Sequence, residues 1–360
     1  MSADAQRPLN LAGAGLRVGV IGVGRIGALH AQTLAGLDDV GSVTVTDAEP
    51  TRAAQVAREL GRGPIGLGVA ETPEELVEAG VDALVIATST PGHAPMLGLA
   101  ARAGLPAFCE KPVALDVAAL DAALAEVERA GTLVQIGFQR RFDAGYLAAR
   151  NAVATGAVGK LLVVRAATHD PAPPPEAYVA TSGGIFRDLH IHDFDAIRFV
   201  TGEEVLEVYA DGAVREAEWF ERYGDVDTAV TVLRLSGGAF VILSGTRHDP
   251  LGYDVRLEVF GTRDSIVAGV DARSPFHSVE AGAVQPNAPG YRNFVERFEP
   301  AYRAELHAFV ATVRDGGASA CTLADARAAL LVALAAERSR AERRPVSIEE
   351  LTSAEAPLVR

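Results

Sequence analysis

Carboxylates and imidazoles alternate with apolar side chains in residues 183–195, and this segment holds the residue types best suited to acid–base chemistry. If a helix begins at Asp188, then His192 lies four residues on and Asp195 three further, so the three side chains share one helical face. Asp188 can then orient His192, and an imidazole oriented in this way is a suitable base for taking a proton from an alcohol. Two other interpretations stay open: Asp188 as a helix N-cap, and all three side chains as ligands of a metal ion.

A glycine-rich motif follows residues 16–21, an apolar run typical of a strand, and precedes an Ala- and Leu-rich stretch typical of a helix. In this G-x-G-x-x-G motif, Gly22 permits a tight turn, Gly24 lets the backbone approach a pyrophosphate, and Gly27 lets the helix pack closely on the strand. The N-terminus of that helix then faces the phosphates. We therefore expect a dinucleotide to contact Gly22, Gly24, Arg25, Ile26 and Gly27. The alternative is that the glycines only form a loop in an α/β domain that binds no nucleotide.

Asp47 indicates which dinucleotide is bound. It directly follows residues 43–46, the next strand-like run, and lies twenty positions after Gly27, where a carboxylate accepts hydrogen bonds from both hydroxyls of an adenosine ribose. The carboxylate would repel a 2′-phosphate, so NAD is expected, although Arg52 is close enough in sequence to leave NADP open. Because the dinucleotide already accepts hydride, we expect no metal ion in the site.

Two further loops are expected beside the cofactor. Residues 83–87 and the run that ends at residue 109 have the composition of parallel strands, and ligands bind outside the carboxyl ends of such strands. The polar residues that follow these two strands, all predicted to contact the cofactor, are Thr88, Ser89, Thr90, His93, Glu110 and Lys111.

The order of the elements predicts two domains. Strand-like runs at 16–21, 43–46 and 83–87 alternate with helical stretches at 28–36, 51–60 and 95–103, which is typical of a doubly wound parallel sheet. After residue 134, strands are expected at 161–167, 228–235, 239–246 and 256–260, with Ser236-Gly237-Gly238 as a hairpin turn. Helices are expected at 188–200, 302–313 and 323–341.

We therefore predict an N-terminal Rossmann domain over residues 16–134, built on a doubly wound parallel sheet. A C-terminal α+β domain over residues 135–348 is predicted to contain a large, mostly antiparallel open sheet, and its last helices could pack back on the Rossmann domain. Residues 1–15 are expected to form a flexible N-terminus and residues 349–360 a tail.

Composition limits the classes of partner. No segment of the 360 residues approaches the ~20 uninterrupted apolar residues of a membrane span, and the first fifteen residues do not have the pattern of a secretory signal. The net charge of −14 disfavours nucleic acid as a partner. The only cysteines, Cys109 and Cys321, form no C-x-x-C pair, so we expect a reducing cytoplasm.

Several motifs together resemble the Gfo/Idh/MocA oxidoreductase family, and most closely its inositol 2-dehydrogenase branch, over residues 17–348. Glu110-Lys111-Pro112 matches the family's E-K-P motif, and Asp188 with His192 matches its D-x-x-x-H pair. Residues 137–143 look like the motif G-F-x-R-R-[FY]-D of inositol dehydrogenases. Residues 169–174 resemble their H-R-[DN]-P loop, with Asp170 where an Arg is usual, and residues 252–254 resemble a segment that lines the polyol pocket in relatives.

This resemblance implies NAD-dependent oxidation of a ring hydroxyl in a cyclic polyol, with myo-inositol as the leading substrate and 2-keto-myo-inositol as the product. It implies that His192 is the base and that Lys111 contacts both the substrate hydroxyl and the nicotinamide ribose, which makes Lys111, Asp188 and His192 the catalytic residues. A ring with many hydroxyls needs both donors and acceptors. The residues expected to supply them are Lys111, Arg140, His169, Asp188, His192 and Tyr253. The alternatives are a salt bridge for Arg140 or Arg141 and a strand aromatic for Tyr253.

Other functions remain open. The substrate could be scyllo-inositol, an aldose or an amino-cyclitol, and some relatives of the family bind the dinucleotide as a signal without turnover. The presence of Lys111, Asp188 and His192 together favours an enzyme, because a sensor has no need of an acid–base pair. The resemblance also implies a homotetramer that covers the open sheet of the second domain.

Overall fold

The protein is described here as a computed structural model that covers residues 15–61 and 65–352. Almost all of the predicted flexible N-terminus, residues 1–14, and residues 353–360 of the predicted tail lie outside this range. The first part of that tail is helical, because α11 spans Ile348–Thr352. Within the described ranges, no helix combines the length and the apolar character needed to cross a membrane.

The chain forms two compact units. The first contains the residues up to Gln139 together with residues 300–327, and the second contains Arg140–Glu299 together with the residues from Ala328 onward. The domain boundaries expected from the sequence stay a prediction.

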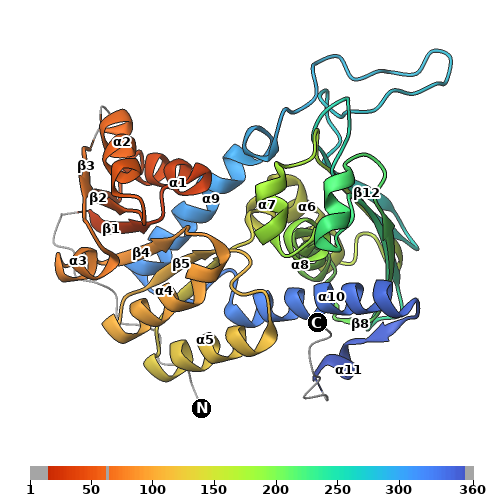
Figure 1. Ribbon diagram of the computed structural model, residues 1–360. Coiled ribbons are helices and arrows are strands. Elements are labelled where there is room, and N and C mark those ends of the chain that lie inside the picture. Colours follow the sequence, from red (N-terminus) through yellow and green to blue (C-terminus); the bar gives the residue numbers. More distant parts are fainter. Residues whose placement is uncertain (1–14, 62–64, 353–360) are drawn as a thin grey trace. The chain divides into compact units, whose positions relative to one another are not determined.

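The first unit contains a six-stranded parallel sheet in the order β3-β2-β1-β4-β5-β6. This order, in which β1 and β4 are neighbours, is that of a Rossmann fold, so the predicted doubly wound sheet is confirmed. Figure 1 shows α1 and α2 on one side of the sheet and α4 and α5 on the other. The strands are β1 (Leu16–Ile21), β2 (Val40–Thr46), β3 (Leu67–Val69), β4 (Ala83–Ile86), β5 (Ala107–Glu110) and β6 (Val134–Gly137). The helices are α1 (Arg25–Ala35), α2 (Pro50–Leu60), α3 (Pro73–Glu78), α4 (Thr90–Ala103) and α5 (Val117–Ala130).

The strands β1, β4, β5 and β6 of this unit are largely buried on both faces, which explains their continuous apolar runs. All four residues of β4 are buried, and Phe108 of β5 is fully inaccessible. The helix α9 (Phe294–Asp315) adds Leu306 and Phe309 to the same core. The short strand β3 and the short helix α3 escaped prediction because each is too brief to show a period.

The second unit contains a seven-stranded sheet in the order β12-β11-β7-β10-β9-β8-β13. Only the pair β7–β10 is parallel, so the prediction of a mostly antiparallel sheet is confirmed. The strands are β7 (Leu161–His169), β8 (Val205–Ala213), β9 (Thr228–Leu235), β10 (Phe240–Thr246), β11 (Asp254–Gly261), β12 (Ser265–Ala268) and β13 (Val346–Ser347). The predicted hairpin is also present: the N–H of Gly238 donates to the carbonyl of Leu235, at 2.9 Å, between β9 and β10.

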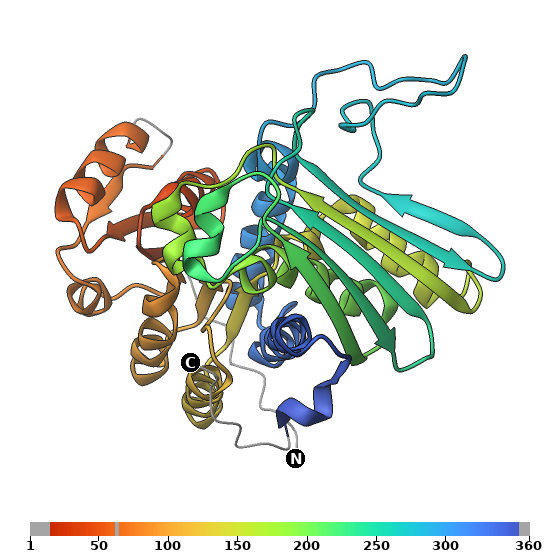
Figure 2. The ribbon, with the colours of Figure 1, turned by 45° about the vertical axis from the view of Figure 1, so that its right-hand side comes forward.

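One face of this sheet is covered and the other carries exposed apolar side chains. Residues of β9 and β10 alternate between buried and accessible, as expected for a strand with one face on a core. Figure 2 shows α6 (Ala144–Ala154) and α8 (Ile191–Thr201) on the covered face. The accessible face of the central strands carries Leu162, Val230, Val232, Phe240 and Ile242, each at least 39% exposed. The remaining helices are α7 (Glu176–Ser182) and α10 (Leu323–Glu342).

Candidate functional site

The glycine loop of the first unit has the geometry of a dinucleotide cradle. Gly22 adopts a φ of +88°, and its N–H donates to the carbonyl of Thr46 at 2.8 Å. A Cβ on Gly27 would overlap the Gly22 carbonyl oxygen, whereas a Cβ on Gly24 would meet no atom within 4 Å. Gly27 is therefore needed for packing, while Gly24 and the neighbouring Arg25 are exposed at the open start of α1. Ile26 lies partly buried between them and Gly27.

Asp47 fixes two backbone segments at once. Its Oδ2 accepts a hydrogen bond from the N–H of Val23 at 2.8 Å, and its Oδ1 accepts one from the N–H of Glu49 at 2.9 Å. Arg52 lies 3.4 Å from Asp47 but 2.6 Å from Glu49, so its charge already has two carboxylate partners. This acidic edge is suited to ribose hydroxyls and unfavourable to a phosphate.

The loop after β4 holds the next group of predicted cofactor residues. Ser89 is exposed at the N-cap of α4, Thr90 is the first residue of that helix, and Thr88 donates its hydroxyl to the Ser89 carbonyl at 3.1 Å. His93 is 2% exposed, and its ring nitrogens lie 2.7 Å from the Pro112 carbonyl and 2.9 Å from the Thr88 carbonyl. Burial lowers the pKa of His93. Because both nitrogens contact backbone, His93 connects two loops, and this geometry does not support the expected direct contact with the cofactor.

The E-K-P loop is held by Glu110. One carboxylate oxygen lies 2.7 Å from Nε2 of His30 in α1, and the other accepts the N–H of Lys111 at 3.2 Å. The peptide bond between Lys111 and Pro112 is cis. The role of His30 could not be predicted from the sequence, because 80 positions separate it from Glu110 and leave no local pattern. The buried carboxyl of Glu305 also faces this pair.

In the second unit, Asp188 accepts two side-chain donors that the sequence did not reveal. The hydroxyl of Tyr178 donates to Oδ1 at 2.8 Å, and Nη2 of Arg247 donates to Oδ2 at 2.7 Å. Arg247 is 4% exposed and also donates to Asp170 at 2.9 Å. The Arg247 guanidinium therefore favours the charged form of Asp188.

The helix around Asp188 differs from the predicted one. Residues 186–190 form a π-helical turn that runs directly into α8, so Asp188 lies inside a helical segment. The N-cap alternative for Asp188 is therefore wrong. His192 follows in the first turn of α8 and is partly buried. Its orientation by Asp188 stays a prediction.

Asp195 is not available to the alternative in which Asp188, His192 and Asp195 bind a metal ion. It is fully buried and accepts hydrogen bonds from Arg141, at 2.9 and 3.2 Å from Nε and at 2.6 Å from Nη2. This fork-like ion pair uses both of its carboxylate oxygens. The salt-bridge alternative is thus confirmed for Arg141, and the geometry does not support Asp195 as a metal ligand beside Asp188 and His192.

Arg140 also forms a buried ion pair, as the salt-bridge alternative expects. It is 1% exposed, with Nη1 2.6 Å from Asp193 and Nη2 3.0 Å from the hydroxyl of Thr168. The Thr168 hydroxyl in turn lies 2.8 Å from Asp193. Burial raises the pKa of Asp193, and Arg140 offsets part of that shift. Two of the three guanidinium nitrogens of Arg140 thus bind inside the protein, and a direct contact between Arg140 and the substrate stays a prediction.

His169 and Tyr253 lie near the ends of neighbouring strands. His169 ends β7, with Nε2 3.2 Å from the hydroxyl of Ser244 and Nδ1 3.8 Å from both Asp249 and Asp254. Tyr253 precedes β11, is 5% exposed, and packs edge-on against Phe298 with ring centroids 6.4 Å apart. Burial raises the pKa of Tyr253, so its phenol stays neutral.

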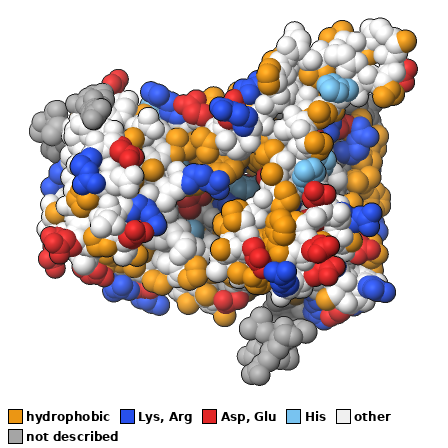
Figure 3. All heavy atoms as spheres, turned by 45° about the horizontal axis from the view of Figure 1, so that its top comes forward, with side chains coloured by type: hydrophobic (Ala, Val, Ile, Leu, Met, Phe, Trp, Pro, Cys, Tyr) orange, Lys and Arg blue, Asp and Glu red, His pale blue; other side chains and the backbone are white. Residues whose placement is uncertain are grey.

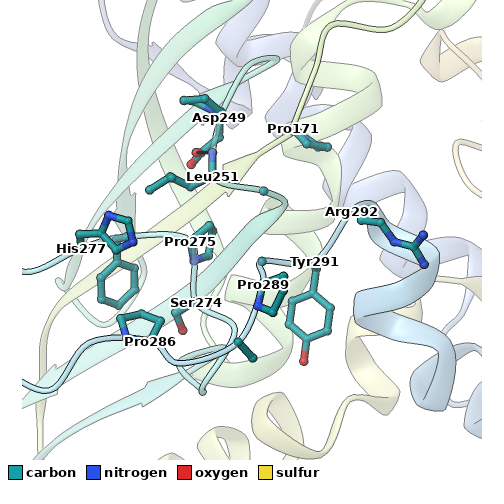
Figure 4. A pocket seen from close by; sticks show the side chains of 15 residues that line it. Pro171, Asp249, Leu251, Ser274, Pro275, His277, Pro286, Pro289, Tyr291 and Arg292 are labelled. Atoms are coloured by element: carbon teal, nitrogen blue, oxygen red, sulfur yellow. Dashed lines mark hydrogen bonds between the residues drawn. The ribbon is translucent and has the colours of Figure 1, made fainter.

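A pocket of about 500 Å³ opens beside these strand ends (Figure 4). None of the predicted substrate-binding residues lines it, and we do not assign the polyol to it. Its lining side chains include Pro171, Asp249, Leu251, His277, Tyr291 and Arg292. On the face drawn in Figure 3, acidic and basic side chains are interspersed.

Comparison with known proteins identifies the family. Residues 16–138 match the profile of an oxidoreductase family with an NAD-binding Rossmann fold, and residues 146–267 match the C-terminal domain of the GFO/IDH/MocA family. The chain belongs to the Gfo/Idh/MocA family. The chain is similar to a myo-inositol 2-dehydrogenase of Thermotoga maritima, with 38% identity over 93% of this chain and 99% of the relative. A scyllo-inositol 2-dehydrogenase (NAD(+)) of Bacillus subtilis is 36% identical over 93% of this chain and 96% of the relative.

Solved structures of the Gfo/Idh/MocA family have the same fold. The scyllo-inositol dehydrogenase from Lactobacillus casei, solved with bound NAD(H) and scyllo-inositol, superposes with a TM-score of 0.82 and 28% sequence identity. The alignment covers 93% of this chain and 99% of that structure. The protein is thus an oxidoreductase with an NAD-binding Rossmann fold.

Proposed function

We propose that this family member oxidises one ring hydroxyl of a cyclic polyol, with myo-inositol as the leading substrate and 2-keto-myo-inositol as the product. The observation that carries the proposal is the charged cluster at Asp188, which Tyr178 and Arg247 hold beside the start of α8, where His192 lies. A polyol ring needs such polar groups, whereas an apolar pocket would not distinguish its hydroxyls. The names of the relatives from Thermotoga maritima and Bacillus subtilis support the same class of substrate.

When bound, NAD⁺ supplies the hydride acceptor. The glycine loop and Asp47 fit this cofactor, because Gly24 leaves open space for a pyrophosphate and Asp47 presents an acidic edge to a ribose. We propose that the cofactor is held by Gly22, Gly24, Arg25, Ile26, Gly27, Asp47, Thr88, Ser89, Thr90, Glu110 and Lys111. His93 would act indirectly by connecting the Thr88 and Pro112 backbones.

Acid–base chemistry is assigned to the second unit. His192 takes the proton of the reacting hydroxyl, and Asp188, kept anionic by Arg247, favours the imidazolium that results. Lys111 stabilises the alkoxide that develops as the proton leaves. His169 and Tyr253 bind the other hydroxyls, while Arg140 positions Thr168, the neighbour of His169.

The first test measures NADH formation by absorbance with myo-inositol, scyllo-inositol, D-chiro-inositol and glucose, each with NAD⁺ and with NADP⁺. We expect the highest kcat/KM with myo-inositol and NAD⁺, and its loss in Lys111→Ala. Highest turnover with scyllo-inositol, D-chiro-inositol or the aldose glucose would replace myo-inositol by that substrate, and an amino-cyclitol is the next compound to test if all four are poor substrates. Tight NAD⁺ binding without turnover of any polyol would favour the alternative of a dinucleotide sensor. The variant His192→Ala distinguishes an enzyme from a sensor. An enzyme would lose turnover and still bind NAD⁺, whereas a sensor would keep its binding of NAD⁺ and of its partner.

The assembly and cellular role are further parts of this proposal. The exposed apolar face of the second sheet, which carries Val230, Val232, Phe240 and Ile242, is suited to bury against another copy of the chain in a homotetramer. We propose a cytoplasmic enzyme of inositol catabolism, in keeping with a sequence that has two cysteines, Cys109 and Cys321, and no C-x-x-C pair. Sedimentation of the purified protein tests the tetramer, and Ile242→Glu is expected to dissociate it.

A further inference from the structure

Three titratable side chains meet in the interior of the first unit, and the proposed reaction gives two of them no role. They are His30 of α1, Glu110 at the end of β5, and Glu305 of α9. One nitrogen or oxygen atom of each lies within 4.8 Å of those of the other two. His30 and Glu305 are fully inaccessible, and the Glu110 side chain is 12% exposed.

Glu305 is the unusual member of this cluster. Within the described part of the chain, neither of its carboxyl oxygens has a hydrogen-bond partner, although both are buried. Burial and, second, the charge of Glu110 raise the pKa of Glu305 well above its usual value. A buried carboxylate without donors, next to a second carboxylate, is strongly disfavoured. The cluster must therefore hold a proton.

The surroundings decide which carboxyl carries that proton. One carboxylate oxygen of Glu110 receives the N–H of Lys111 at 3.2 Å, and the other lies 2.7 Å from Nε2 of His30. Glu305 receives no such donor. Gln135 donates to the backbone carbonyl of Glu305 at 2.9 Å and so fixes the turn of α9 that directs this side chain at Glu110.

We propose that Glu305 is a positioning residue for the proposed dehydrogenase reaction: its protonated carboxyl donates to the Glu110 carboxylate and so holds the loop that carries Lys111. The inference rests on the proposed function, since Lys111 acts there on the substrate oxygen. His30 connects the same carboxylate to α1, the helix that begins at the glycine cradle. Glu110 therefore joins α1, the helix at the cofactor cradle, to the loop that carries Lys111. Glu305, on α9, holds the Glu110 carboxylate in that position.

A bound cation is the competing explanation for the cluster. One imidazole and two carboxylates are a common ligand set for divalent metals. A single proton removes the same repulsion without bringing a doubly charged ion into an interior lined by Phe108 and Tyr302, which pack on the His30 ring. Metal analysis of the purified protein, before and after dialysis against a chelator, distinguishes the two. A stoichiometric metal would overturn the proposal.

The decisive experiment compares Glu305→Gln, Glu305→Leu and the control Glu299→Gln, which removes an exposed carboxyl on the same helix. The amide of Gln can still donate to Glu110, whereas Leu fills the space without a donor. We expect Glu305→Gln and the control to keep kcat and KM for myo-inositol within about threefold of the starting protein. We expect Glu305→Leu to remain folded with unchanged NAD⁺ affinity and to lose about 10- to 100-fold in kcat, because small displacements of a catalytic group are costly.

A second readout does not depend on turnover. Hydrogen exchange of the peptide around Lys111 is expected to become faster in Glu305→Leu and to stay unchanged in Glu305→Gln. Wild-type kcat and unchanged exchange in Glu305→Leu would overturn the proposal, and so would equal damage in both variants. If no polyol is turned over but the exchange pattern is as expected, the positioning role stands and the proposed function fails.

Discussion

The buried ion pair between Arg140 and Asp193 allows a quantitative test of the second unit. Both side chains are 1% exposed, 2.6 Å apart, and share the hydroxyl of Thr168. Asp193→Leu leaves the Arg140 guanidinium buried without a counter-ion, and an arginine cannot escape by losing its proton. Breaking a buried pair from one side costs about 3–5 kcal/mol, so we expect that loss in the free energy of unfolding.

The double variant Arg140→Met/Asp193→Leu removes both charges and replaces them with apolar groups of similar volume. Such replacements are often neutral, and we expect a loss of at most about 2 kcal/mol, part of it from the unpaired Thr168 hydroxyl. The two substitutions should therefore couple by about 2–3 kcal/mol or more. Glu204→Gln is the matched control, because it breaks the more exposed pair between Glu204 and Arg198 and should cost at most about 1 kcal/mol.

The assay is urea unfolding followed by the fluorescence of Trp219, the only tryptophan of the chain, which lies in the second unit. With a slope of about 2 kcal/mol per molar urea, the expected loss lowers the midpoint by roughly 1.5–2.5 M. A loss below about 1 kcal/mol in Asp193→Leu, or a double variant as unstable as the sum of the single ones, would refute the reasoning.

Three further predictions concern the cofactor loop and the response to pH. Gly27→Ala should lower the melting temperature and abolish NAD⁺ binding, because its Cβ would overlap the Gly22 carbonyl oxygen. Gly24→Ala should keep the melting temperature, since its Cβ meets only the open cradle, and should bind NAD⁺ at least about tenfold more weakly in a fluorescence titration. Asp47→Ser should lower kcat/KM with NAD⁺ about 10- to 100-fold and raise the relative rate with NADP⁺; an unchanged cofactor preference in steady-state assays would remove Asp47 from the ribose site. Burial raises the pKa of Glu337 to about 7, so the stability that its protonation contributes is present at acid pH and lost as pH rises through that value. Glu337→Gln should flatten the dependence of the urea midpoint on pH between about 4.5 and 7, and an unchanged slope would contradict the shift.

The sequence predicted those features that depend on residues close together in the chain. The cradle of Gly22, Gly24 and Gly27 follows from the strand, turn and helix that flank it, and the structure has these elements. The hairpin at Gly238 and the alternation along β9 are equally local. The π-helical turn at Asp188 was missed because hydrophobic periodicity does not distinguish it from an α-helical one.

The contacts that set the chemistry of the charged groups could not be predicted in this way. Arg247 is 59 positions from Asp188, and His30 is 80 positions from Glu110, so only the folded chain brings each pair together. The partner of Arg140 could not be predicted for the same reason, because Asp193 is 53 positions away and packing buries both side chains.

By itself, then, the sequence determined the class of fold, the nucleotide cradle and the residue types of an acid–base site, since local spacing and periodicity specify these. Only the tertiary structure decided which of those charges are already neutralised inside the protein, as at Asp195, and which carboxyl, as at Glu305, lies buried without a hydrogen-bond partner among the described residues. The physical reason is that burial and through-space partners determine the state of an ionisable group, and both depend on how distant segments pack.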